Sequence, residues 1–265
     1  MTTEKIETKT EKTIDLGIFD LFKEFAGSQK TLHKMWVEPD LIILNEPNVR
    51  SLMFTPKEPL FTEEFGINDI IKFTSMVSLF DDVEIELRLP DIIVKNKKGT
   101  QILSFKSSRK PSFAEVIASN NKSKIRHESS RRFEEEGKHL EFDLDPETIG
   151  KIRKASSIFA SGSAVKSIIQ ISKLEGRDEV NLIVRNEASE SIFCQTIPAK
   201  NVGKLGEFKA SFNSDFLMSG NWKVNIFPRD LIDNTDPEKP CPAIWTHMVD
   251  EARGLSMLIV YRNEI

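Results

Sequence analysis

The stretch GINDIIKFTSMVSLFDDVEIEL (residues 66–87) contains a short amphipathic helix followed at once by a strand. The apolar positions of the helix, expected from Ile67 to Phe80, lie on one face at helical spacing. The run VEIELRL after it alternates apolar and polar residues, as a half-buried strand does. A second stretch, SFNSDFLMSGNWKVNIFP (211–228), repeats this order with a shorter helix over 213–219, a glycine turn and a strand. One order of elements at two places indicates an internal duplication.

Each of these stretches is preceded by another helix and a group of strands. The first helix is expected from Leu16 to Ala26, with Asp15 as N-cap and Gly27 as the stop. The second begins at Asp145-Pro146, an N-cap followed by a proline at the first helical position, and ends near Gly162. Strand-like runs follow the helices in both halves: LHKMWV, LIIL and VRSLMF in the first, and VKSIIQISK, VNLIVRN and SIFCQTI in the second.

The same pattern divides the chain. Residues 1–14 are polar and read as a disordered tail, and residues 109–138 read as a polar connector with a local charge of about +3. Two domains of the same kind are expected, 15–108 and 139–265, the second with an insertion over 229–243. The fold class is α+β, dominated by strands, with two similar domains.

Composition limits the classes of protein to which the chain can belong. The formal net charge is −4 and the pI about 5.8, which disfavours DNA binding through bulk charge but permits a local basic face. Only two cysteines occur, so a disulfide scaffold is disfavoured and a reducing, cytoplasmic setting is expected. No apolar run approaches the roughly 18 residues of a membrane span, and the polar N-terminus carries no signal-peptide core.

No catalytic constellation stands out. The four histidines are scattered, none of them at metal-ligand spacing with another histidine or a cysteine, and the glycines form no phosphate-binding loop. Acidic groups such as Asp81-Asp82 fall at a helix-to-strand junction, where they cap or solvate it. We therefore expect no enzyme activity, no metal and no cofactor.

Residues 66–87 and 211–228 resemble the second helix and following strand of the two domains of a DNA sliding clamp, the polymerase processivity factor. The C-terminal run LSMLIVYRNEI is similar to the final strand of these proteins. Among clamps, the two-domain length most resembles the bacteriophage type, with proliferating cell nuclear antigen as the cellular relative. The pattern extends over nearly the whole chain beyond residue 14, although no single motif is diagnostic.

The resemblance implies a mechanism without chemistry. Three copies would close a homotrimeric ring of six similar domains around duplex DNA, with sheets outside and helices lining the hole. The ring would tether a DNA polymerase, would be placed by a clamp loader and, as in some phage clamps, would serve the transcription machinery. Sliding needs loose attraction to phosphates without base readout. The candidates for facing DNA are Lys23, Lys30, Lys72, Lys151, Arg153 and Lys154.

Partners of clamps insert a short hydrophobic peptide into a pocket formed by the connector, the C-terminal strand and a loop of the first domain. The residues of this chain in those places are Val49, Phe113, Val116, Ile117, Val260 and Tyr261. The alternative for the connector residues is that they only anchor the connector to its own domain. For the lysines and Arg153, the alternative is that they are ordinary solvated helix residues.

Two other classes of protein remain open from the sequence. A β-rich structural or assembly protein of a virus particle would share the duplicated hydrophobic pattern, but would give no reason for basic residues on short helices. A hydrolase or nuclease would need several carboxylates that converge with a lysine or histidine in space.

Overall fold

The computed structural model describes residues 17–26, 34–46, 50–80, 82–88, 90–108, 139–160, 168–174, 176–186, 191–202, 205–228 and 243–262. Within these ranges, the first half of the chain has two helices and seven strands: α1(Gly17–Ala26), β1(Lys34–Glu38), β2(Leu41–Glu46), β3(Arg50–Phe54), β4(Phe65–Ile67), α2(Ile70–Val77), β5(Glu84–Arg88), β6(Asp91–Lys95) and β7(Ile102–Lys106). The second half contains β8(His139–Leu144), α5(Pro146–Ala160), β9(Ile168–Lys173), β10(Glu179–Asn186), β11(Ser191–Pro198), β12(Lys200–Val202), β13(Phe208–Asn213), the 3-10 turn η1(Ser214–Phe216), β14(Trp222–Pro228), β15(Ala243–Asp250) and β16(Leu255–Arg262).

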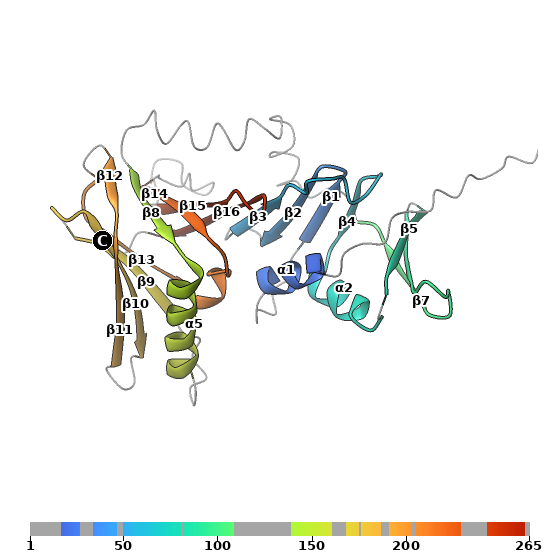
Figure 1. Ribbon diagram of the computed structural model, residues 1–265, viewed down its shortest axis with the longest axis horizontal. Helices are drawn as coiled ribbons and strands as arrows, with labels where there is room; N and C mark the ends of the chain where they lie inside the picture. The colour runs from blue at the N-terminus through green and yellow to red at the C-terminus, as the bar shows by residue number, and fades with distance from the viewer. Residues whose placement is uncertain are drawn as a thin grey trace, which may run out of the picture.

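One long sheet runs through both halves of the chain. Its nine strands have the order β12-β8-β14-β15-β16-β3-β2-β1-β4. The halves meet where β16 pairs antiparallel with β3, with Met257 opposite Leu52. Two smaller sheets, β11-β10-β9-β13 and β5-β6-β7, lie at opposite ends of the molecule (Figure 1).

All three described α-helices lie on the same side of the long sheet (Figure 1). Helices α1 and α2 pack together through Phe19 and Phe73, whose ring centroids are 6.0 Å apart. One hydrophobic core joins the helices to the inner face of the sheet and continues from the first half into the second, since it includes Phe22, Leu52 and Ile259. We call the side of the long sheet away from the helices its outer face.

Strand register shows the duplication directly. In the first half, the inward residues Met35, Leu44 and Leu52 lie side by side across β1, β2 and β3. In the second half, Ile169, Val184 and Phe193 lie side by side across β9, β10 and β11. Met35 and Ile169 each follow the last residue of the opening helix, Ala26 or Ala160, by the same number of residues. Strands β1, β2 and β3 are therefore equivalent to β9, β10 and β11.

The helices expected at the start of each half are confirmed. Helix α1 ends at Ala26, and its side chains Phe19, Phe22 and Phe25 are buried, with Leu21 packed against the core beside them. Helix α5 begins at Pro146, and Thr148 N–H donates to Asp145 Oδ1 at 2.7 Å, so Asp145 caps it. That hydrogen bond also lowers the pKa of Asp145. The cap proposed for α1 lies outside the described residues.

The helix expected from Ile67 to Phe80 is shorter in the structure, where α2 runs from Ile70 to Val77. Residues 65–67 instead form β4, which pairs with β1 at the edge of the long sheet, and α2 begins after Asp69. The side chain of Asp69 accepts from Lys72 N–H at 2.9 Å, so Asp69 is the N-cap of α2. Strands β12 and β13 were also missed, and the expected helix over 213–219 is only the single turn η1. No helix in the described part of the chain is both long and apolar enough for a membrane crossing.

Candidate nucleic-acid face and partner surfaces

The helix side of the long sheet is where the structure places the described DNA-facing candidates. Lys151, Arg153 and Lys154 all project from the exposed side of α5, because Ile149 and Ile152 bury the other side. Helix α5 thus carries three cations against the single acid Glu147. Lys23 is exposed on α1 and Lys72 on α2, and Lys30 lies outside the described residues. Four of the five described candidates are lysines, which suit undirected attraction to phosphate.

The three cations of α5 differ in how far a nearby carboxylate neutralises their charge. Lys151 Nζ lies 2.7 Å from Glu147 Oε1 one turn earlier, and this hydrogen-bonded pair raises the pKa of Lys151. Arg153 donates to Glu24 Oε1 on α1, also at 2.7 Å. Lys154 forms no ion pair with any residue that the structure describes. Lys154 therefore offers the least compensated charge of α5.

Arg153 has a structural task that the sequence did not indicate. Its partner Glu24 also accepts from the backbone N–H of Ser219 at 2.7 Å, so one carboxylate joins α1, α5 and the turn after η1. Arg153 remains 46% exposed, so its other donors still face solvent. The residue links the two halves of the chain and lends only part of its charge to the helix face.

On α1 and α2 the cations are sparser. Lys23 lies 3.9 Å from Asp20 on the same helix, and α1 also carries Glu24. Lys72 has no ion-pair partner among the described residues. The positive charge of the helix face is therefore concentrated on α5, in the second half.

The partner-peptide pocket can be followed only in part. Val49, Phe113, Val116 and Ile117 lie outside the described residues. Val260 and Tyr261 belong to β16, opposite Trp245 and Ile244 of β15, and the structure places their backbone only.

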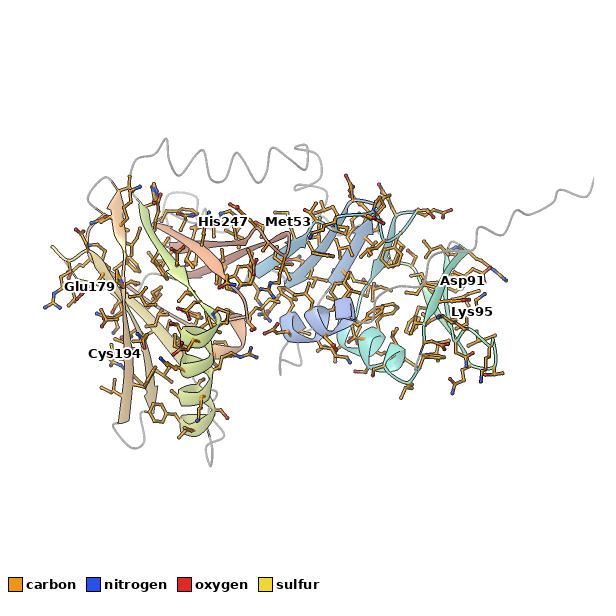
Figure 2. All side chains as sticks on the ribbon, in the orientation of Figure 1. Met53, Asp91, Lys95, Glu179, Cys194 and His247 are labelled. Atoms are coloured by element: carbon orange, nitrogen blue, oxygen red, sulfur yellow. The ribbon has the colours of Figure 1, made fainter. Side chains whose placement is uncertain are left out.

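The outer face carries an apolar cluster that was not predicted from the sequence. Trp36, Leu41 and Ile43 are buried there, and Met53 packs beside them, separate from the main core. Figure 2 labels Met53 on this side, away from the helices. A signal existed in LIIL (41–44): an uninterrupted apolar run is typical of a strand that is buried on both faces.

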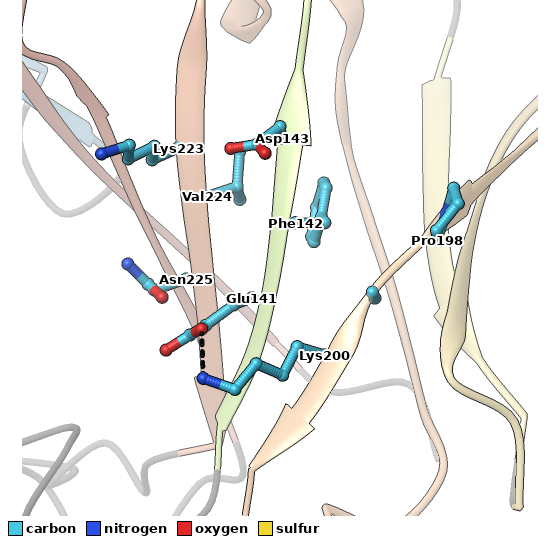
Figure 3. A pocket seen from close by; sticks show the side chains of 9 residues that line it. Glu141, Phe142, Asp143, Pro198, Lys200, Lys223, Val224 and Asn225 are labelled. Atoms are coloured by element: carbon cyan, nitrogen blue, oxygen red, sulfur yellow. Dashed lines mark hydrogen bonds and ion pairs between the residues drawn. The ribbon is translucent and has the colours of Figure 1, made fainter.

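A groove on the outer face of the second half has a volume of about 630 Å³. Glu141 and Asp143 of β8, Lys200 of β12, and Lys223 and Asn225 of β14 line it (Figure 3). Its charges are largely paired, since Glu141 lies 3.2 Å from Lys200 Nζ and 2.7 Å from the imidazole of His139. The hydrogen bond from His139, followed by that from Lys200, lowers the pKa of Glu141.

This arrangement does not suit Glu141 to act as a general acid. A general acid would need a carboxyl whose pKa is raised, whereas that of Glu141 is lowered. Within the described ranges, no three His, Cys, Asp or Glu side chains come together as a metal site would require.

Comparison with known proteins identifies the fold. No protein-family model matches the sequence, and neither does any curated protein. Solved structures do match over nearly the whole chain. A putative DNA polymerase III beta subunit from Eubacterium rectale is 10% identical with a TM-score of 0.57, over 98% of this chain and 67% of that one. The beta subunit from Pseudomonas aeruginosa is 11% identical with a TM-score of 0.54, over 98% and 68%.

Two further structures carry functional descriptions of their own. The DNA polymerase sliding clamp of Bacillus subtilis is 13% identical with a TM-score of 0.53, over 98% of this chain and 66% of that one. The beta clamp of Helicobacter pylori, solved bound to a DNA ligase peptide, is 8% identical with a TM-score of 0.54, over 92% and 64%. The chain thus spans about two thirds of the length of these bacterial clamps. They do not support the closer kinship with the bacteriophage type and proliferating cell nuclear antigen. They do show that the chain has the fold of a DNA sliding clamp, the α+β class expected from its sequence.

Proposed function

We propose that this protein is a sliding clamp, which encircles duplex DNA and holds a replicative DNA polymerase on it as a processivity factor. The observation that carries the proposal is the placement of α1, α2 and α5 on one side of the long sheet, in a chain that matches a clamp fold over 98% of its length (Figure 1). Encirclement raises the effective concentration of the polymerase at its template through linkage, without tight contacts. Such a protein carries out no chemical step and needs no cofactor.

The proposed ring contains three copies of the chain. Two similar halves per chain would give six similar units, and a head-to-tail contact closes when the rotation between copies allows it. Clamps of the bacteriophage type resemble this chain in having two domains, and we keep that type as a prediction. Loading by a clamp loader and service to the transcription machinery are part of the proposal, as is a setting in the cytoplasm of a cell or of an infected host.

The helix side would face the DNA. Lys154 and Lys72 supply the least compensated charges, Lys151 and Arg153 add partly paired ones, and Lys23 and Lys30 complete the proposed set. A few lysines spaced along helices attract phosphates without reading bases, which suits sliding. The partner peptide is proposed to bind near Val260 and Tyr261 at the end of β16, together with Val49, Phe113, Val116 and Ile117.

Topological binding has a direct test. The protein is threaded at high concentration onto linear duplex DNA, both ends are then blocked with bulky bound protein, and the complex is passed over a sizing column in high salt. We expect retention that disappears when a restriction enzyme opens the blocked DNA, because a ring slides off a free end. Retention that does not depend on the ends, or none at all, would refute encirclement.

The two competing classes predict other outcomes. A nuclease would shorten the DNA when Mg²⁺ is added, whereas a clamp leaves it intact. A structural protein of a virus particle would assemble without DNA and would show no dependence on blocked ends. The helix side, with its cations on α5, favours the clamp over the structural protein.

A further inference from the structure

The groove on the outer face of the second half lies beside an open strand edge. Strand β12 pairs with β8 only at residues 139–141, where Lys200 lies opposite Glu141. The rest of β8, residues 142–144, pairs with β14 on one side and with no described strand on the other. Successive residues of a strand direct their backbone N–H and C=O groups to alternate sides. At least one of these three residues therefore presents both groups to the open side.

The edge of β8 stays open because the chain turns away from it. Strand β11 leads into β12 through Ala199, whose N–H donates to the carbonyl oxygen of Asp178 at 3.0 Å. That hydrogen bond holds Ala199 beside the start of β10, in the small sheet, and away from β8. Pro198 before it has no N–H to donate. The groove of about 630 Å³ is left between them, and ligand pockets commonly measure about 300–1,000 Å³.

The two sides of β8 give this groove two kinds of wall. Figure 3 shows Phe142 directed toward Pro198 across the gap, whereas Asp143 lies on the opposite side of the strand. Phe142 is buried and Asp143 is exposed. A chain segment in the groove would therefore meet an apolar wall on one side and a carboxylate on the other.

The charges of the groove are unevenly compensated. Lys200 Nζ lies 3.2 Å from Glu141, and Lys223 Nζ lies 3.5 Å from Glu251. The carboxylate of Asp143 forms no ion pair with any residue in the described ranges. The uncompensated charge of the groove is thus negative, and it lies next to the open edge.

We infer that the groove binds an extended segment of a partner protein, which adds to β8 as a further strand. In this mode of recognition, main-chain hydrogen bonds supply affinity and alternate side chains supply specificity. The residue opposite Asp143 would be a lysine or arginine, and its neighbours along the segment would be apolar, since they face Phe142 and Pro198. Strands β14 and β15 separate this site from β16 and the proposed peptide pocket, so the inference does not rest on the proposed function.

Two synthetic peptides test the chemistry of the partner. One is a fluorescently labelled heptapeptide in which lysine alternates with valine, and the other carries glutamate in place of lysine. Fluorescence anisotropy measures their binding to the full-length protein in low salt. We expect the lysine peptide to bind at least about tenfold more tightly, because Asp143 attracts one and repels the other. Equal binding of the two peptides, or binding of neither, would overturn the inference.

A charge reversal tests the site. Asp143→Lys should reverse the preference between the two peptides, and circular dichroism checks that this exposed substitution leaves the fold intact. Glu63→Lys is the matched control, because it makes the same charge change at an exposed residue of the first half and should keep the wild-type preference. Equal effects of the two variants would show that the peptide responds only to overall charge, which would overturn the site.

Backbone methylation tests the added strand itself. Methyl groups on alternate nitrogens block one side of an extended peptide, so one methylation pattern should abolish binding and the other should leave it unchanged. Equal tolerance of both patterns would refute strand addition. A fall in the mass in solution when the peptide is added would assign the groove to a second copy of this chain, and would overturn the inference as well. Failure of the protein to remain on end-blocked DNA would refute the clamp function alone.

Discussion

Arg50 is a charged residue at the point where the two halves of the chain meet. Its side chain is 0% exposed, and its Nε donates to Glu46 Oε2 at 2.7 Å. Its guanidinium also donates to the carbonyl oxygen of Phe25 and lies 4.5 Å from the ring centroid of Phe25 and 4.4 Å from that of Phe216. Phe25 belongs to the first half and Phe216 to the second, so one arginine stacks on aromatic rings from both.

This environment makes Arg50 a residue whose loss should be costly. Arg50→Met removes the buried arginine that is paired with the Glu46 carboxylate, and we expect the free energy of unfolding to fall by about 3–5 kcal/mol. The free energy of unfolding is measured by urea denaturation, with fluorescence as the signal. Adding Glu46→Leu should recover part of the loss, because the buried negative charge is then removed as well.

Arg88→Met is the control for the Arg50 variant. Its ion pair with Glu86 has the same 2.7 Å distance, but the arginine is 60% exposed, so the expected loss is below about 1 kcal/mol. Equal losses for the two variants would show that the burial of Arg50 contributes nothing.

At the scale of elements, the helices are unequal although the halves are duplicated. Helix α2 has 8 residues, whereas its counterpart η1 is one turn of 3 residues. The short α2 has little helical stability of its own and depends on its cap and on packing against α1 through Phe73. Its position on the helix side therefore rests on a few contacts.

The N-cap of α2 gives the prediction at this scale. Asp69→Ala removes the acceptor for Lys72 N–H, and we expect a loss of about 1 kcal/mol in the free energy of unfolding. Asp69→Asn keeps an acceptor oxygen and should cost much less. Chemical denaturation of the three proteins side by side measures both. If Asn and Ala were equally destabilising, the cap would not be the cause.

For the whole molecule, the distribution of charge matters more than its sum. The chain has a net charge of −4, yet three of the four charged residues of α5 are cations. An acidic protein can therefore attract phosphates on one side while its other surfaces repel them. That asymmetry is what a ring around DNA would need.

Charge reversal on α5 tests this asymmetry. Lys151→Glu combined with Lys154→Glu should weaken binding to DNA in low salt and stimulation of the polymerase, while the mass in solution stays unchanged. Lys200→Glu with Lys223→Glu is the matched control, because it makes the same charge change on the outer face (Figure 3). Equal effects of the two pairs, or none from the α5 pair, would show that α5 does not face the DNA.

The sequence by itself determined the elements whose signal is local. The helices that open each half, the cap at Asp145 and the alternating strand after α2 follow from residue spacing, because periodicity shows which face of an element is apolar. The duplicated order of these elements predicted an α+β class with two similar domains, and the resemblance to sliding clamps predicted the clamp fold. The lysines of α5 were candidates on the same basis, as they lie off its apolar stripe.

Only the tertiary structure decided the rest. Strands β4 and β12 have three residues each, too few for any pattern, and exist because a longer strand lies beside them. The ion pair of Arg153 joins it to a residue 129 positions away, and Arg50 is buried by rings from both halves. The pairing of β16 with β3 likewise joins residues 255–259 to residues 50–54. Local spacing encodes which face of an element is buried, whereas its partner is chosen by which surfaces meet when the whole chain packs.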